Sequence, residues 1–213
     1  QHNFKVMLTL APEHAAPGQI KQLTSAGVVV CAGHTDAHYE SVVNALKEGL
    51  SGFTHLYNAM RPTTGREPGV VGAALEDANS WCGIIIDTYH VHAASARIAC
   101  AAKPRGKIYL VTDAMSTVGS ETIFEKDGCL VNAEGRLAGS AIGMVDAVRL
   151  NTEWVGMELS ESLRMASLYP AEYMQVDNYL GRIQPGFRAD LVHFTDDYRV
   201  THTWIAGDFL RHG

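Results

Sequence analysis

The chain has 213 residues, enough for one large domain or one and a half small ones. Hydrophobic residues make up 46% and charged residues 19%, as in a globular protein that buries a core. A net charge of −6 argues against a basic nucleic-acid surface, and no apolar run approaches the ~20 residues of a membrane span. The four cysteines have no CxxC pairing, so we expect buried free thiols and a cytoplasmic location.

Short apolar runs alternate with helical stretches over the first half of the chain. The expected strands are Phe4–Leu10, Val28–Ala32, Gly52–His55, Cys82–Ile86 and Ile108–Thr112. The expected helices are Pro17–Ala26, Asp36–Glu48 and Ala93–Ala102. The strands are apolar almost throughout, which is typical of strands buried on both faces of a parallel sheet. The alternation therefore favours part of a (β/α)8 barrel or a doubly wound sheet.

The pattern changes in the second half. The segment Thr122–Leu137 contains DG and EG turn signals and predicts a hairpin. Helices are expected near Ile142–Trp154 and Ser160–Ala171, with Ser160 as the N-cap of the second. The tail, Gly181–Arg211, reads as β structure again. We expect it to form a small β domain together with the predicted hairpin.

Polar residues gather where the expected strands end. His34 and His55 each close an apolar run, Asp87 closes a third with His90 just after, and Asp113 closes a fourth. In a parallel barrel these carboxyl ends share the face that holds the active site. Neutral imidazole is a good ligand for zinc and similar divalent metals. Asp113 is either a helix N-cap or a carboxylate that exchanges a proton during catalysis.

Two other residues invite a functional interpretation. The Gly/Pro-rich segment Arg61–Gly72 is expected to be one long loop after the His55 strand. Arg66 lies in this loop, where it suits a phosphate as a bidentate partner or pairs with a surface carboxylate. Glu13 follows the first expected strand and could pass for a metal ligand. A turn role behind Pro12 is the preferred interpretation of Glu13.

Several contiguous motifs resemble one family. They are AGHTDA, GFTHLYNAM, GREPGVVGA, GIIIDTY followed by HVH, LVTDAM, GRLAGS and MASLYPA. Together they resemble the N-acetylglucosamine-6-phosphate deacetylases of the amidohydrolase superfamily. The similarity runs from about Lys5 to the end, and THLYNAM followed by GREPG is its most specific part. The stretch GRIQPGFRADLVHF is similar to a tail shared by many amidohydrolases.

The resemblance implies an α/β fold: the C-terminal portion of a (β/α)8 TIM-type barrel, about strands 4–8, with part of a small β-sandwich domain. Residues 1–121 would form the partial barrel with the metal site. Residues 122–138 would be a β segment of the small domain and a substrate loop. Residues 139–180 would be the closing barrel helices, and residues 181–213 the C-terminal β segment of the small domain.

The resemblance also implies roles for individual residues. His34 and His55 fall on metal ligands, and Asp113 falls on the catalytic aspartate. The implied substrate-binding residues are Asn58, Ala59, Arg66, Asp87, Thr88, Tyr89, His90, Leu137, Ala138 and Gly139. Arg66 would bind the phosphate near the interface of a homodimer, and His90 would lie near the phosphate. One Zn²⁺ is the expected cofactor, with Fe²⁺ or a two-metal site as alternatives.

The implied reaction is deacetylation of N-acetylglucosamine 6-phosphate. One departure affects this expectation, because the family's glutamate ligand, in an HLEGPF-like motif, does not occur in the sequence. We therefore expect the natural gene to be longer. Two alternatives stay open: another amidohydrolase acting on a cyclic or linear amide, and a non-catalytic fragment or interaction module.

Overall fold

The computed structural model describes residues 4–117, 122–126 and 129–212. The chain forms two compact units, Gln1–Val111 and Thr112–Gly213, each of which has its own internal packing. No helix among the described residues is long and apolar enough to cross a membrane.

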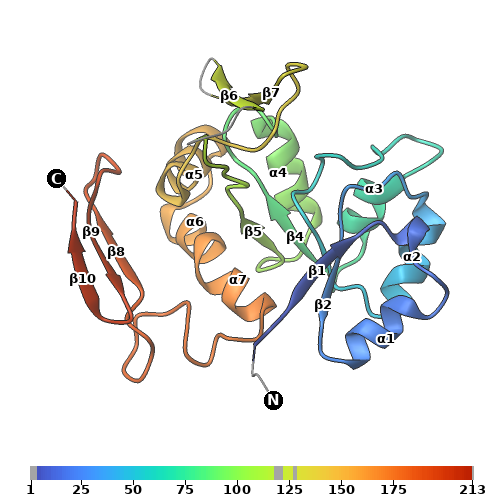
Figure 1. Cartoon of the computed structure of the whole chain (residues 1–213), viewed down its shortest axis with the longest axis horizontal. Coiled ribbons are helices and arrows are strands. Elements are labelled where there is room, and N and C mark those ends of the chain that lie inside the picture. The colour runs from blue at the N-terminus through green and yellow to red at the C-terminus, as the bar shows by residue number, and fades with distance from the viewer. Residues whose placement is uncertain (1–3, 118–121, 127–128, 213) are drawn as a thin grey trace. The chain divides into compact units, whose positions relative to one another are not determined.

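The first unit contains a five-stranded parallel sheet (Figure 1). Its strands are β1 (Met7–Leu10), β2 (Val29–Ala32), β3 (Gly52–Phe53), β4 (Trp81–Ile84) and β5 (Ile108–Leu110). They lie side by side in chain order, and every neighbouring pair is parallel. A doubly wound sheet reverses its strand order at a switch point, whereas a barrel does not. The predicted parallel sheet is confirmed, and its order is that of a barrel.

Helices connect the strands. They are η1 (Pro12–His14), α1 (Gln19–Ser25), α2 (Tyr39–Lys47), α3 (Gly69–Glu76) and α4 (Ala93–Ala102). Helix α1 contacts β2, α2 contacts α3, and α3 contacts α4, so the helices form a connected layer beside the sheet (Figure 1). Three of these helices were predicted. The interpretation of Arg61–Gly72 as loop throughout is wrong, because α3 begins at Gly69 and buries Val70 and Val71.

The core of the first unit follows its central strands. All four residues of β2 are buried, as are Phe53 of β3 and Ile84 of β4. Strand β1 differs, because Met7 and Leu8 are exposed by 38% and 39% although the sequence predicted burial on both faces. The reason is that β1 is the outermost strand of the sheet and, among the described residues, pairs with β2 alone. All four cysteines are free thiols as predicted, and all but the half-buried Cys100 are buried.

The second unit combines a hairpin, a helical segment and a sheet. Strands β6 (Ile123–Lys126) and β7 (Cys129–Asn132) pair antiparallel, which confirms the predicted hairpin, while its DG turn at 127–128 lies outside the described residues. The tail forms an antiparallel sheet of β8 (Leu191–Phe194), β9 (Val200–Ile205) and β10 (Asp208–Arg211), in the order β10-β9-β8. Among the described residues, the hairpin and the tail form separate sheets. Their membership of one small domain stays a prediction.

Between the hairpin and the tail lie four helical elements. They are α5 (Met144–Leu150), the π-helix η2 (Asn151–Val155), α6 (Leu159–Ala166) and α7 (Leu168–Tyr173). The single helix expected over Ser160–Ala171 is therefore two, because a proline ring at Pro170 clashes with the carbonyl of Ala166, four residues earlier. Ser160 is not the N-cap, since α6 starts at Leu159 behind Glu158.

A buried polar network stabilises these helices. The Glu161 carboxylate accepts hydrogen bonds from the Tyr169 hydroxyl at 2.7 Å and from Arg164 Nε at 3.0 Å. Buried carboxylates such as that of Glu161 are stable only when their oxygens are paired in this way.

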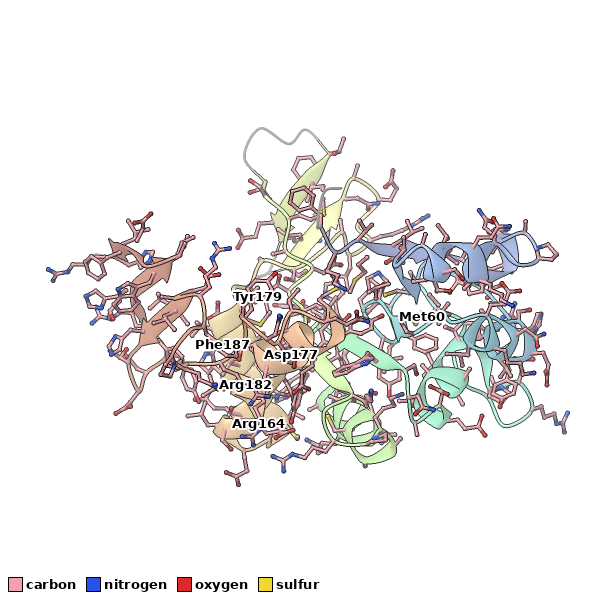
Figure 2. The ribbon with its side chains drawn as sticks, turned by 90° about the horizontal axis from the view of Figure 1, so that it is seen from below. Met60, Arg164, Asp177, Tyr179, Arg182 and Phe187 are labelled. Carbon is pink, nitrogen blue, oxygen red and sulfur yellow. The ribbon has the colours of Figure 1, made fainter. Side chains whose placement is uncertain are left out.

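After α7, the chain passes through Asp177, Tyr179, Arg182 and Phe187 (Figure 2) before it reaches β8.

Candidate metal and substrate site

The two histidines predicted as metal ligands follow adjacent strands. His34 comes two residues after β2, and His55 comes two residues after β3. Both have left-handed backbone conformations, with φ of 49° and 36°. Gly33 allows the first turn, because a Cβ atom there would lie 2.7 Å from Cγ2 of Thr9 and 3.0 Å from Cβ of Thr54. Strained non-glycine residues of this kind concentrate at functional sites.

The imidazole rings of His34 and His55 converge. Their Nε2 atoms are 2.8 Å apart, and their ring centroids are 4.6 Å apart at an interplanar angle of 79°. His55 is buried and His34 is exposed. Two imidazole nitrogens directed at one point fit a divalent metal as two of its ligands. Within the described residues, no group of three or more His, Cys, Asp or Glu side chains completes such a site.

The turn after His55 holds the next predicted residues. The amide of Leu56 donates to the carbonyl oxygen of Gly83 at 2.7 Å, which anchors the turn to β4. Asn58 donates to the His55 carbonyl oxygen from its backbone at 3.0 Å and from its side chain at 3.3 Å. Ala59 is exposed, with φ of 47°. Burial raises the pKa of neighbouring Tyr57 to about 12, so its hydroxyl stays protonated.

The turn after β4 is built on Asp87. Its Oδ1 atom accepts from the backbone amides of Tyr89 and His90 at 2.9 and 2.8 Å, and its Oδ2 atom accepts from His90 Nδ1 at 2.5 Å. Burial favours the neutral acid, but these hydrogen bonds together lower the pKa of Asp87. Thr88 and Tyr89 are exposed at the tip of the turn. Asp87 therefore holds His90 in one orientation.

Arg66 is exposed in the loop between β3 and α3. The loop is anchored by Glu67, whose carboxylate accepts from the backbone amides of Tyr39 and Gly69 at 2.8 and 3.0 Å and contacts Nδ1 of His38 at 3.1 Å. The Tyr39 and His38 hydrogen bonds lower the pKa of Glu67. In the part of the chain that the structure describes, no carboxylate pairs with Arg66. The guanidinium can thus take up an anion.

In the second unit, Asp113 is exposed and has φ of 51°. The amide of Ser140 donates to the Asp113 carbonyl oxygen at 2.9 Å, and the Ser140 hydroxyl donates to the Thr112 carbonyl oxygen at 2.5 Å. A Cβ atom at Gly139 would lie 2.7 Å from the Asp113 carbonyl oxygen. The loop of Leu137, Ala138 and Gly139 therefore lies directly against the Asp113 turn.

Sequence reasoning did not identify the tertiary partners of two polar residues, Glu13 and Lys103. The Glu13 carboxylate reaches the segment after His34, where it accepts hydrogen bonds from Thr35 and Asp36. Lys103 is buried, and its ammonium donates to carbonyl oxygens at the C-terminal end of α3. Both partnerships join residues more than 20 positions apart, so no local pattern could indicate them.

A sequence model of the amidohydrolase family matches residues 14–210. The chain is 46% identical to N-acetylgalactosamine-6-phosphate deacetylase of Shewanella sp. (strain ANA-3), with 96% of this chain and 54% of the relative covered. It is 35% identical to N-acetylglucosamine-6-phosphate deacetylase of Haemophilus influenzae, with 94% and 55% covered.

The crystal structure of N-acetylglucosamine-6-phosphate deacetylase from Pasteurella multocida superimposes with a TM-score of 0.90 at 35% identity. The superposition covers 97% of this chain and 57% of that protein. The chain thus spans about half the length of the relatives that it matches. Its first unit has the fold of the corresponding part of an amidohydrolase barrel.

Proposed function

Because the chain belongs to the amidohydrolase family, we propose that it is part of an enzyme that hydrolyses the acetamide of N-acetylglucosamine 6-phosphate. The products are glucosamine 6-phosphate and acetate. The observation that supports this proposal most is the convergence of His34 and His55, whose Nε2 atoms are 2.8 Å apart at the ends of adjacent strands. A structural pair of histidines would not require two strained backbone conformations.

His34 and His55 would hold a divalent metal through their Nε2 atoms, with Zn²⁺ as the first candidate and Fe²⁺ or a two-metal site as alternatives. Such a metal supplies Lewis-acid chemistry at the acetamide carbonyl. Imidazole binds such a metal in its neutral form. The acidic third ligand of the family would come from a segment outside this sequence.

Asp113 is the proposed general base and acid. As a carboxylate it takes a proton from the attacking water, and as an acid it returns that proton to the departing amine. A group in this role contributes about 10²–10⁴-fold to the rate. The turn of Asp113 is held by Ser140 through the backbone, which leaves the exposed carboxylate available for proton exchange.

The sugar phosphate would be held by three segments. Arg66 and His90 select for the phosphate, and a guanidinium without a carboxylate partner is suited to that task. Asn58 and Ala59 would contact the sugar, together with the Asp87–His90 turn. The backbone of Leu137, Ala138 and Gly139 would contact the substrate as well. In a homodimer, Arg66 would serve the neighbouring subunit's site, and a cytoplasmic location fits this metabolism.

A second candidate substrate is the C4 epimer, N-acetylgalactosamine 6-phosphate. The Shewanella relative, at 46% identity, is named for that substrate, whereas the Haemophilus relative named for the glucosamine compound is 35% identical. The acetamide and the phosphate are the same in both epimers. The residues named above would therefore act on either compound, and contacts to the C4 hydroxyl would decide between them.

Acetate release from the purified protein tests both candidates directly. We expect release from at least one of the two phosphorylated sugars and a bound metal in stoichiometric amount. Asp113→Asn should lower kcat by about 10²–10⁴-fold while the bound metal is retained. A protein that binds no metal and releases no acetate would instead support the alternative of a non-catalytic fragment or interaction module.

Arg66→Ala separates a sugar-phosphate deacetylase from another amidohydrolase. Loss of a charge-assisted contact to the phosphate should lower kcat/KM for the phosphorylated sugar about 10–100-fold. The unphosphorylated sugar should be processed as before, because it makes no such contact. An equal loss for both sugars would favour an enzyme for another cyclic or linear amide.

A further inference from the structure

Glu13 links the loops of the two candidate metal ligands, although it belongs to neither. It lies in η1, directly after β1. Its Oε2 atom accepts a hydrogen bond from the Thr35 hydroxyl at 2.5 Å, and its Oε1 atom accepts one from the Asp36 amide at 2.8 Å. Both donors come from the residues that immediately follow His34.

Thr35 also forms hydrogen bonds with the loop that follows His55. It is buried, with 4% of its surface exposed. Its amide donates to the Ala59 carbonyl oxygen at 3.0 Å, and its carbonyl oxygen accepts from the Arg61 amide at 3.1 Å. These two bonds form a parallel bridge between Thr35 and Met60, a residue on the segment after His55 (Figure 2). The Glu13 carboxylate, the His34 loop and the His55 loop are thus one hydrogen-bonded unit.

Arg61 also connects the His55 loop to the His34 loop. Arg61 donates from Nε to the Asp36 carbonyl oxygen at 2.7 Å and from Nη2 to the Asp36 carboxylate at 2.7 Å. Asp36 is therefore bound by Glu13 through its amide and by Arg61 through its carbonyl and side chain. Three consecutive strand-to-helix connections meet at these contacts.

Both histidines need such support, because their backbones are strained. His34 and His55 have positive φ values, and Ala59 has φ of 47°. Conformations of this kind persist only when the surrounding structure holds them. Metal affinity depends on this support. Removing the residues that hold metal ligands in place lowers the metal affinity of a site by about 10–100-fold.

We propose that Glu13 is a positioning residue, which sets the separation of the His34 and His55 imidazoles by fastening Thr35 and Asp36. This inference rests on the metal site of the proposed function. Glu13 is not a ligand in it, because both carboxylate oxygens are engaged by the His34 loop. This role explains why Glu13 lies at the start of the β1–α1 connection, which contains neither histidine.

The test compares the Zn²⁺ affinity of the purified protein with that of Glu13→Ala, measured by competition with a chromophoric chelator. We expect the variant to bind about tenfold more weakly. The visible spectrum of the Co²⁺-loaded protein should also change, because ligand geometry changes. Thr35→Val removes the hydroxyl that Glu13 holds, so the double variant should bind little more weakly than either single variant.

Glu48→Ala is the matched control. The Glu48 carboxylate also accepts two backbone hydrogen bonds, from Gly18 at 3.1 Å and Lys21 at 3.4 Å, but these lie at the start of α1. This variant should lose thermal stability and keep the Zn²⁺ affinity and Co²⁺ spectrum of the unmodified protein. An equal loss of affinity in both variants would overturn the inference, because destabilisation alone would explain it.

Glu13→Gln separates positioning from charge. Its amide can still accept from Asp36 and donate to the Thr35 oxygen, so part of the affinity should return. If Glu13→Gln binds Zn²⁺ as weakly as Glu13→Ala, the effect comes from the lost negative charge and the inference is overturned. Unchanged Zn²⁺ affinity in Glu13→Ala overturns this inference but leaves the proposed function standing. An unmodified protein that binds no metal overturns the proposed function as well.

Discussion

The Asp87→Asn substitution tests how the turn after β4 holds His90. The Asp87 side chain is 2% exposed and accepts three hydrogen bonds, two on Oδ1 from backbone amides and one on Oδ2 from His90 Nδ1. Asparagine keeps the shape of the side chain and the Oδ1 acceptor. It replaces Oδ2 by an amino group, which is a donor directed at the ring nitrogen of His90.

The cost of the substitution follows from the bond that is lost. A hydrogen bond to a charged group contributes about 1.5–3 kcal/mol. His90 can recover part of this by changing its tautomer and accepting from the new amide, so we expect a loss of about 2 kcal/mol. With a urea m-value of about 2 kcal/mol/M, the unfolding midpoint should fall by about 1 M.

The pH dependence checks the cause. Burial raises the pKa of Asp87, but the His90 side chain and the two backbone amides outweigh burial and lower it. A carboxyl group whose folded pKa is lowered stabilises the protein above its unfolded pKa of about 3.9. That stabilisation is lost as the pH falls through the folded pKa. The difference in urea midpoint between Asp87→Asn and the unmodified protein should therefore be largest at pH 7 and shrink below about pH 4.

Asp36→Asn is the control, because the Asp36 carboxylate contacts Nη2 of Arg61 at 2.7 Å but is 80% exposed. An exposed pair contributes about 0–1 kcal/mol, so this variant should unfold close to the unmodified protein. Urea unfolding followed by far-UV circular dichroism measures all three proteins. Equal midpoints for Asp87→Asn and the unmodified protein at pH 7 would refute the reasoning, as would an undiminished difference at pH 3.

Three further substitutions test buried and close-packed positions in the two units. Lys103→Met should cost about 3 kcal/mol in urea unfolding, because buried carbonyl oxygens, including that of Ala74, lose their donor; a loss below 1 kcal/mol would contradict this. Gly33→Ala should cost about 1–3 kcal/mol and weaken metal retention, because the new methyl group overpacks the strand ends; unchanged chelator competition would count against it. Gly139→Ala should lower the melting temperature, because Gly139 has φ of +107° and the new Cβ would lie 2.7 Å from the Asp113 carbonyl oxygen. An unchanged melting curve would show that the loop moves freely.

The parallel sheet could be predicted from the sequence, because its strands are short apolar runs separated by helices. The predicted strands appear in the structure with ends shifted by at most three residues. Other predictions failed for local or tertiary reasons. Helix α3 was hidden by the Gly/Pro-rich segment before it, and the helix expected over Ser160–Ala171 is divided into α6 and α7. Strand β1 is exposed because, among the described residues, one neighbouring strand pairs with it.

The residues that follow the strands could be predicted from local sequence, because a strand and the residue after it are contiguous. His34, His55, Asp87 and Asp113 were all identified in that way. Which of them meet, and what holds them, follows from the folded arrangement of the strands. The 2.8 Å approach of His34 and His55, and the reach of Glu13 to the loop of His34, join residues about 20 positions apart. Such contacts depend on strand order and strained backbone turns, and neither is recorded in local sequence patterns.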